Sequence, residues 1–268
     1  MSGELEGMRI LVTSPSATSP RLAGSLEAMG AEVVEVPLIT FQPVPDQAPV
    51  ARAIAGLPGY DLIVFTSATA VEALVLASSE AGAPLVPAAA NGTSGPEVVA
   101  VGPATAEAAR MRGFACREVP KRFSGEGLAE LLTSRDLTGK RVLIPRAEAG
   151  GEELPEALRK AGADVDVVAL YRTVPDPRGH RQIPGLLGSR LDMVTFTSGS
   201  AVESFVAAAG AEFRRPTRME IACIGPSTAE AARAARLEPD VVATEHTVAG
   251  LVAAIRDHAV ARKSGTTS

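Results

Sequence analysis

Hydroxyl-bearing turns are the part of this sequence best suited to chemistry. Short apolar runs end in such turns, and an Ala-rich segment follows most of them; the polar residues at these ends are Ser14, Ser67, Thr105, Arg146, Ser198, Ser200 and Thr228. Ser and Thr are preferred at helix starts as caps, which is one interpretation. The other is anion binding, because a helix start presents unpaired N–H groups and a partial positive charge. The second interpretation predicts a ligand with several carboxylates or phosphates, held mainly by backbone amides.

Several common site chemistries lack their motifs. No GxGxxG follows the first apolar run, no GxxxxGK[ST] occurs, and a GxSxG elbow is absent, which disfavours nucleotide binding and acyl transfer. The three histidines, His180, His246 and His258, are scattered, and the two cysteines have no metal-like spacing. We therefore expect no metal and no cofactor.

Composition excludes two classes of partner. The formal net charge is −5 and aromatic residues make up 3% of the chain, so neither a basic stripe nor stacking platforms for nucleic acid are expected. No apolar run approaches the roughly 20 residues that span a bilayer. The N-terminus carries acids where an export signal would be basic, so we expect a cytoplasmic protein. We also expect a monomer.

The elements that must position these turns alternate along the chain. Apolar runs of strand length precede Ala-rich helices, which we expect at 70–77, 104–112, 154–161, 201–209, 228–235 and 248–258. Gly30, Gly113 and Gly162 stand where helices should end. Alternation of this kind predicts α/β domains with parallel, flavodoxin-like sheets, whose strand ends carry the functional edge.

A long-period repeat organises the chain. The segment FTSATAV at 65–71 recurs as FTSGSAV at 196–202, and VGPATAEAAR at 101–110 recurs as IGPSTAEAAR at 224–233. A looser third pair begins at Arg9 and Arg141. The order is the same in both copies, which predicts an internal repeat of two half-length units.

Two Pro-bounded extended runs, 36–46 and 168–177, occupy matching places in the copies and predict a two-stranded linker between domains. Domain one is then 1–38 plus 175–268, and domain two is 44–168. The functional edges of the two domains would face each other across a cleft. We expect a surface insertion at 78–97 and a disordered polar tail at 261–268.

The repeated FTS turns, the repeated GP-x-TAEAA turns and the late run Leu170-Tyr171-Arg172-Thr173 together resemble uroporphyrinogen-III synthase, in order and over about 8–258. The resemblance implies two α/β domains and a lyase of tetrapyrrole and haem biosynthesis. That family cyclises hydroxymethylbilane to uroporphyrinogen III, inverting ring D and losing water without metal or cofactor. It also implies a transient contact with the enzyme that forms the bilane.

The resemblance assigns substrate-contacting hydroxyls to Ser67, Thr105, Ser198, Ser200 and Thr228, and the family tyrosine to Tyr171. Tyr171 would donate a hydrogen bond to the leaving hydroxyl, or else only pack on the linker. Many relatives have Pro after the FTS serine, whereas this chain has Ala68 and Gly199, so the backbone of these turns differs from the usual pattern.

Two other classes of function stay open on the residues alone. A non-enzymatic two-domain protein that binds or senses a small anion would share the linker and the cleft, but it would need an export signal or an output domain. A sugar-nucleotide transferase with two α/β domains would need a carboxylate base, and no acid is repeated at these turns.

Overall fold

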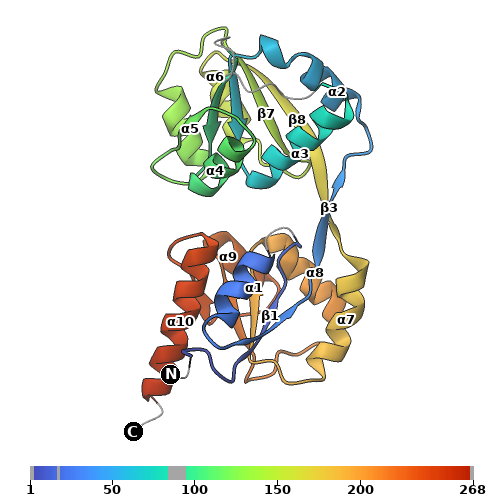
Figure 1. Ribbon diagram of the computed structural model, residues 1–268, viewed down its shortest axis with the longest axis vertical. Helices are drawn as coiled ribbons and strands as arrows, with labels where there is room; N and C mark the ends of the chain where they lie inside the picture. The colour runs from blue at the N-terminus through green and yellow to red at the C-terminus, as the bar shows by residue number, and fades with distance from the viewer. Residues whose placement is uncertain (1–2, 17–18, 84–94, 266–268) are drawn as a thin grey trace. The chain divides into compact units, whose positions relative to one another are not determined.

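The computed structural model describes residues 3–16, 19–83 and 95–265. The chain divides into two compact units (Figure 1). Unit 1 contains the chain up to Thr40 and from Val174 onward, and unit 2 is Phe41–Thr173.

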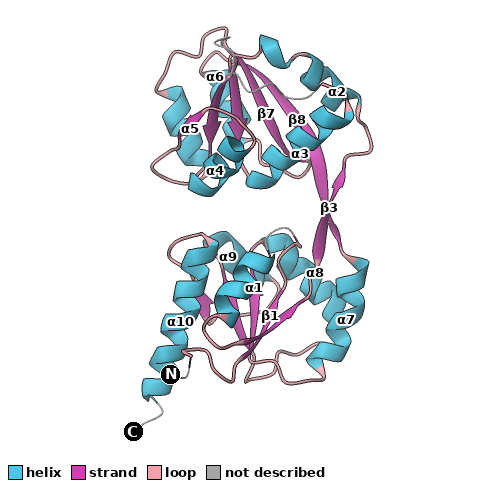
Figure 2. Ribbon diagram, in the orientation of Figure 1, coloured by secondary structure: helices cyan, strands magenta, loops and turns pink. Residues whose placement is uncertain are grey.

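Unit 1 is a five-stranded parallel sheet between two layers of helices (Figure 2). Its strand order is β2-β1-β9-β10-β11. The strands are β1 (Arg9–Val12), β2 (Glu32–Glu35), β9 (Met193–Phe196), β10 (Glu220–Cys223) and β11 (Val241–Val242). One face packs on α7 (Pro177–Leu187), α8 (Gly199–Ala209) and α9 (Pro226–Ala234), and the other on α1 (Ser19–Glu27) and α10 (Val248–Gly265). In chain order the strands run 2-1-3-4-5, which is the flavodoxin-like arrangement.

Unit 2 contains a six-stranded sheet in the order β3-β8-β7-β4-β5-β6. The strands are β3 (Ile39–Pro43), β4 (Leu62–Phe65), β5 (Glu97–Ala100), β6 (Cys116–Glu118), β7 (Arg141–Ala147) and β8 (Asp164–Pro175). Helices α2 (Ala48–Ala55), α3 (Ala68–Glu80) and α4 (Pro103–Met111) cover one face, and α5 (Gly125–Thr133) and α6 (Glu153–Lys160) the other. A short 3₁₀ helix, Leu57–Gly59, precedes β4.

The prediction of α/β architecture with parallel sheets is confirmed. If β7 is taken as the first strand of unit 2, then β8, β4, β5 and β6 follow the same 2-1-3-4-5 order as unit 1. Strands β4 and β9, which carry the two FTS turns, then occupy equivalent places. The internal repeat stays a prediction, and this shared order supports it.

Strands β3 and β8 carry the chain from one unit into the other. Val44 N–H donates to Leu170 O over 3.3 Å, and Asp176 N–H donates to Leu38 O over 2.9 Å. Because the residue numbers fall on one strand as they rise on the other, the two strands pair antiparallel. Pro43 and Pro175 stand at the ends of these strands, where a missing N–H does least harm to a ladder.

Three glycines stand just beyond helix ends, as predicted. Gly30, Gly113 and Gly162 have φ of 94°, 86° and 92°, as expected for residues just beyond a helix end. The first five predicted helices begin and end within three residues of α3, α4, α6, α8 and α9.

Two segment predictions need correction. Helix α3 runs to Glu80, inside the expected insertion at 78–97; residues 84–94 of that segment lie outside the described residues. Helix α10 continues to Gly265, so the predicted disordered tail is wrong for 261–265, and 266–268 are not described. The reason is a long-range contact, because Arg262 Nη1 lies 2.6 Å from Glu220 Oε1 at the start of β10.

No helix in the described parts of the chain has the length and apolar character needed to cross a membrane.

Candidate active site

A cavity of about 620 Å³ opens at the carboxyl edge of the unit 2 sheet. Thr66 and Ser67 follow the end of β4 there, β7 contributes Arg146, and β8 contributes Tyr171. The other lining residues include Ser124, Gly150, Gly151 and Glu153. These three strands are neighbours in the order β8-β7-β4, so adjacency in the sheet brings the three predicted residues together. Three of the predicted site residues, Ser67, Arg146 and Tyr171, therefore share one cavity.

Tyr171 presents its hydroxyl to this cavity from a buried ring. The residue is 7% exposed, and its ring packs edge-on against Phe41 with 5.3 Å between centroids. Its hydroxyl lies 3.1 Å from Ser67 Oγ. Burial raises the pKa of the Tyr171 phenol above its ordinary value, and the hydrogen bonds with Ser67 and Thr69 oppose that rise. The phenol is therefore a protonated hydrogen-bond donor near neutral pH.

Ser67 has two functions at once. It is the N-cap of α3, since its Oγ accepts a hydrogen bond from Ala70 N–H over 3.0 Å. The same oxygen contacts Tyr171. Capping therefore accounts for Ser67 in part, and it also fixes the serine where it can orient the phenol.

Arg146 is the cation of the cavity. Its side chain is only 12% exposed, while Glu152, its partner in an ion pair, is 56% exposed. Its guanidinium also donates to Gly151 O. The pair is formed with an exposed carboxylate on the loop before α6, so another carboxylate could take the same place on the guanidinium.

Thr105 and Thr228 do not cap their helices, contrary to the capping interpretation. The caps are Gly102 and Gly225, which offer no side-chain oxygen, and a proline follows each. The threonines are 6% and 3% exposed, and their hydroxyls have no hydrogen bond within the described residues. A Gly-Pro helix start leaves the next amide N–H groups without an internal acceptor. Both turns are thus available to an anion.

The remaining predicted residues lie at the carboxyl edge of the unit 1 sheet. Ser14 Oγ, 1% exposed as a residue, is 3.1 Å from Thr197 Oγ1, at the ends of β1 and β9. Ser198 caps α8 by accepting from Ala201 N–H over 3.2 Å, and its Oγ is 3.1 Å from Ser200 Oγ. Capping explains Ser198, whereas Ser14 and Ser200 have only other hydroxyls as side-chain hydrogen-bond partners among the described residues.

The structure adds two ring side chains that the sequence reasoning missed. A Cβ placed on Gly102 would lie 3.3 Å from Phe123 Cβ, and one on Gly225 would lie 2.9 Å from His246 Cδ2. Each ring therefore lies against a Gly-Pro turn of its own unit.

The segments that carry these rings are built alike. Ser124 Oγ accepts from Gly127 N–H over 3.1 Å, and Thr247 Oγ1 accepts from Gly250 N–H over 3.0 Å. A Cβ on Gly127 or on Gly250 would come within 2.0 or 2.1 Å of a carbonyl oxygen, so both positions require glycine. Both rings could have been found in the sequence from one pattern, ring-Ser/Thr-x-x-Gly, which occurs at the same distance beyond each Gly-Pro turn.

The chemistry these groups can perform is hydrogen-bond donation and anion binding. A protonated phenol, a guanidinium and several hydroxyls surround the unit 2 cavity, with the carboxylates of Glu126 and Glu153 on its wall. No group of three or more His, Cys, Asp or Glu residues able to hold a metal ion occurs in the part of the chain that the structure describes. This arrangement suits a reaction whose substrate carries the reactive groups itself.

Comparison with known proteins points to one family. The family model described as uroporphyrinogen-III synthase HemD matches residues 20–253. A uroporphyrinogen-III synthase of Synechococcus elongatus is 31% identical over 268 residues, covering 95% of this chain and 97% of the relative. A putative uroporphyrinogen-III synthase of Methanothermobacter thermautotrophicus is 30% identical, covering 81% and 85%. Among solved structures, a uroporphyrinogen III synthase mutant of Thermus thermophilus has a TM-score of 0.62 at 21% identity, covering 94% of this chain and 98% of that one.

Proposed function

The chain belongs to the uroporphyrinogen-III synthase family of lyases, and we propose that it cyclises hydroxymethylbilane to uroporphyrinogen III with inversion of ring D and loss of water. The observation that carries the assignment of roles is the cavity in which Tyr171, Ser67 and Arg146 meet. The anion sensor and the sugar-nucleotide transferase are not favoured, because the family match covers most of the chain.

The substrate of this reaction carries eight carboxylates, which explains the abundance of anion-binding groups. In our proposal the Gly-Pro helix starts at Thr105 and Thr228 and the guanidinium of Arg146 hold carboxylates, with Ser14, Ser198 and Ser200 as further hydrogen-bond partners. A helix start contributes about 0.3–1 kcal/mol per anion when exposed and more when partly buried. Several such contacts together fix the conformation of a flexible linear molecule.

Tyr171 assists departure of the hydroxyl group. The hydroxyl leaves from the hydroxymethyl carbon, and the N–H proton of the same pyrrole is lost, so the elements of water depart and an azafulvene remains. Tyr171 donates a hydrogen bond to the departing oxygen and keeps its own proton overall. Ser67, which contacts the phenol at 3.1 Å, orients it for this donation. The protein needs no strong acid, because the electron-rich pyrrole drives ionisation.

The larger task of the protein is to direct ring D. Its substituted carbon must reach the azafulvene before its free carbon does, which is a problem of holding two parts of one molecule in a particular geometry. Contacts with the carboxylates supply that positioning. Location in the cytoplasm, a monomeric state and transient contact with the bilane-forming enzyme stay predictions.

The test of this function is the isomer of the product. Freshly prepared hydroxymethylbilane is incubated with the protein, and the oxidised porphyrins are resolved. We expect isomer III with the protein and isomer I, the product of spontaneous closure, without it. If only isomer I accumulates at high protein concentration, the proposed function is wrong.

We also predict that Phe123 contacts a pyrrole face of the substrate. The Phe123 residue is 55% exposed, and it directly precedes the cavity residues Ser124 and Glu126. An aromatic contact contributes about 0.5–1.5 kcal/mol beyond area burial, so Phe123→Ala should raise KM by roughly 3–10-fold with little change in kcat. Steady-state kinetics measure this, and the melting temperature should move little because the ring is exposed.

The control for Phe123→Ala is Met111→Ala. Met111 is also apolar and is 81% exposed, but it ends α4 at the far end from the Gly102 turn. It should leave KM unchanged. If Phe123→Ala lowers the melting temperature and leaves KM as it was, then the ring only covers the Gly102 turn.

A further inference from the structure

A second cavity lies at the amino edge of the unit 1 sheet, opposite the carboxyl edge that carries Ser14, Ser198 and Ser200. It measures about 500 Å³ and is lined by residues from the end of α8, from the loop before β10 and from the end of α9. Helices α8 and α9 begin at the carboxyl ends of β9 and β10, so their own ends lie at the amino edge. None of the predicted site residues lines it.

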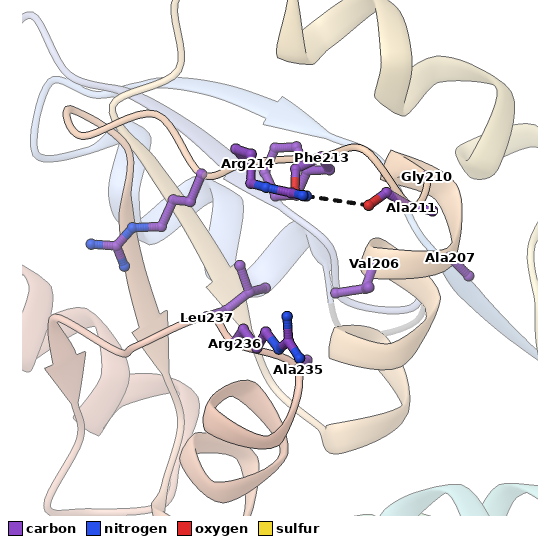
Figure 3. A pocket seen from close by; sticks show the side chains of 10 residues that line it. Val206, Ala207, Gly210, Ala211, Phe213, Arg214, Ala235, Arg236 and Leu237 are labelled. Carbon is purple, nitrogen blue, oxygen red and sulfur yellow. Dashed lines mark hydrogen bonds between the residues drawn. The ribbon is translucent and has the colours of Figure 1, made fainter.

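The walls of this cavity combine apolar side chains with two arginines. Figure 3 shows Arg214 on one side and Arg236 on the other, with Val206 and Leu237 between them. Phe213 closes the upper side and packs edge-on against Phe205, with 5.6 Å between ring centroids. The cavity therefore has an apolar lining and guanidinium groups at its rim.

Arg236 has an unfavourable backbone for an arginine. Its φ is 60°, and it is the one non-glycine residue with positive φ among the described residues. It stands just beyond the end of α9, and the matching position beyond α4 is Gly113, with φ of 86°. Glycine adopts this conformation without the steric penalty that a side chain incurs. An arginine here needs a reason that lies in its side chain.

No polar contact of the Arg236 side chain in the described parts of the chain supplies that reason. The guanidinium of Arg236 has no hydrogen bond or ion pair within the described residues. The neighbouring Arg215 differs, because it pairs with Asp240 at 2.9 Å. Arg214 donates through Nη1 to Phe213 O over 2.9 Å and to Ala211 O over 3.3 Å, which leaves its other N–H groups available. The hydrogen bond from Leu237 N–H to Ala232 O, 2.8 Å, closes the end of α9 and accounts for the left-handed backbone at Arg236, as glycine usually does at this position. It does not account for the presence of an arginine side chain there, whose guanidinium stays available to a ligand.

We propose that this cavity binds a small molecule with a carboxylate on a compact aromatic or branched apolar group. The carboxylate pairs with Arg236, assisted by Arg214, and the apolar group packs on Val206, Phe213 and Leu237. A volume of about 500 Å³ falls in the usual range for small-molecule sites. Guanidinium matches a carboxylate through two parallel hydrogen bonds. The site is separate from the proposed tetrapyrrole site and does not depend on it.

The probe for this site is 1-naphthoate, titrated by its own fluorescence. The chain contains no Trp, so the naphthalene emission has little protein background. Wild-type protein should bind the probe saturably with one site. Arg236→Gly should weaken binding by roughly 10–100-fold, because a charge-assisted contact is lost. The same variant should raise the melting temperature by about 2–4 °C, because the strained residue is replaced by glycine.

Three controls make the result specific. Arg218→Ala removes the same charge at an exposed position that does not line the cavity, and it should bind as wild type does. Arg236→Lys keeps the charge and should lose only a few-fold. Formation of isomer III should be unchanged in Arg236→Gly. The proposal is overturned if Arg236→Gly binds the probe as well as Arg218→Ala, or if the neutral 1-naphthamide binds wild type as tightly as the carboxylate.

Discussion

Replacing Tyr171 by phenylalanine is expected to lower kcat by roughly 10–1000-fold, the size of a lost hydrogen bond to a leaving group. The substitution removes one oxygen and keeps the ring, so the edge-on contact with Phe41 remains. Ser67 keeps its hydrogen bond from Ala70 N–H. The free energy of unfolding should therefore fall by no more than about 1 kcal/mol. Loss of kcat without loss of the fold would identify the hydroxyl itself as the active group.

The matched control is Tyr60→Phe, which changes the only other tyrosine of the chain. Its hydroxyl donates to Asp166 Oδ2 over 2.6 Å and also lies in unit 2, but it precedes β4, whereas Ser67 follows that strand. Single-turnover rates of bilane consumption should be near wild type in Tyr60→Phe and low in Tyr171→Phe. Equal rates in wild type and Tyr171→Phe would leave Tyr171 with packing alone.

The pH dependence follows from the same hydroxyl. Burial raises the pKa of Tyr171 above 10.0, so the phenol stays protonated through neutral and mildly alkaline pH. Because its pKa is higher in the folded than in the unfolded chain, its contribution to stability is complete below about pH 10 and falls as pH rises through the folded value. We expect kcat to show no loss from this group below pH 10. A drop between pH 7 and 9 that is absent from Tyr171→Phe would contradict the assignment.

Local sequence was sufficient for the α/β class but not for the order of the strands. Periodicity and glycine positions predict each βα unit because they act within a few residues. Whether β4 lies beside β7 depends on packing between segments far apart in the chain, and no local pattern encodes it. That adjacency is what brings Ser67 next to Arg146 and Tyr171.

Helices α7 and α10 differ from what the local sequence predicts. The sequence analysis predicts an extended run up to 177 and no helix directly after it, yet α7 begins at Pro177 and continues through Pro184. Asp176 makes this start possible, because its Oδ1 accepts from Arg178 N–H over 2.8 Å. The polar end of α10 was mistaken for a tail because its partner, Glu220, is remote in sequence.

Candidate site residues were predictable where the turn motif was repeated. The serines and threonines at the FTS and GP turns all lie at the carboxyl edge of their own sheet. The sequence analysis does not predict Phe123 or His246 as site residues. The motif that contains them is short, and its ring is a phenylalanine in one copy and a histidine in the other. Their contact with a Gly-Pro turn is visible only when the backbone is folded.

Arg146→Gln is expected to raise KM by roughly 10–100-fold, because a largely buried guanidinium that binds a substrate carboxylate is replaced by a neutral amide. Arg141→Gln is the control. It removes the same charge from the same strand at its opposite end, where Arg141 pairs with Asp166 at 3.4 Å and lies over the Tyr60 ring. Arg141→Gln should keep KM near the wild-type value. An equal rise of KM in Arg141→Gln and Arg146→Gln would instead show a general effect of net charge on the binding of an anionic substrate.

Glu152→Gln tests the same contact in the opposite direction. In the free protein the Glu152 carboxylate occupies the guanidinium of Arg146 and competes with the substrate. Since exposed ion pairs contribute about 0.2–1 kcal/mol, removing the competitor should lower KM by roughly 1.5–5-fold, provided that Arg146 is present. In the double variant with Arg146→Gln, the Glu152 substitution should have no effect on KM. A higher KM in Glu152→Gln alone would mean that the ion pair holds Arg146 in its working position, and the competition argument would then be wrong.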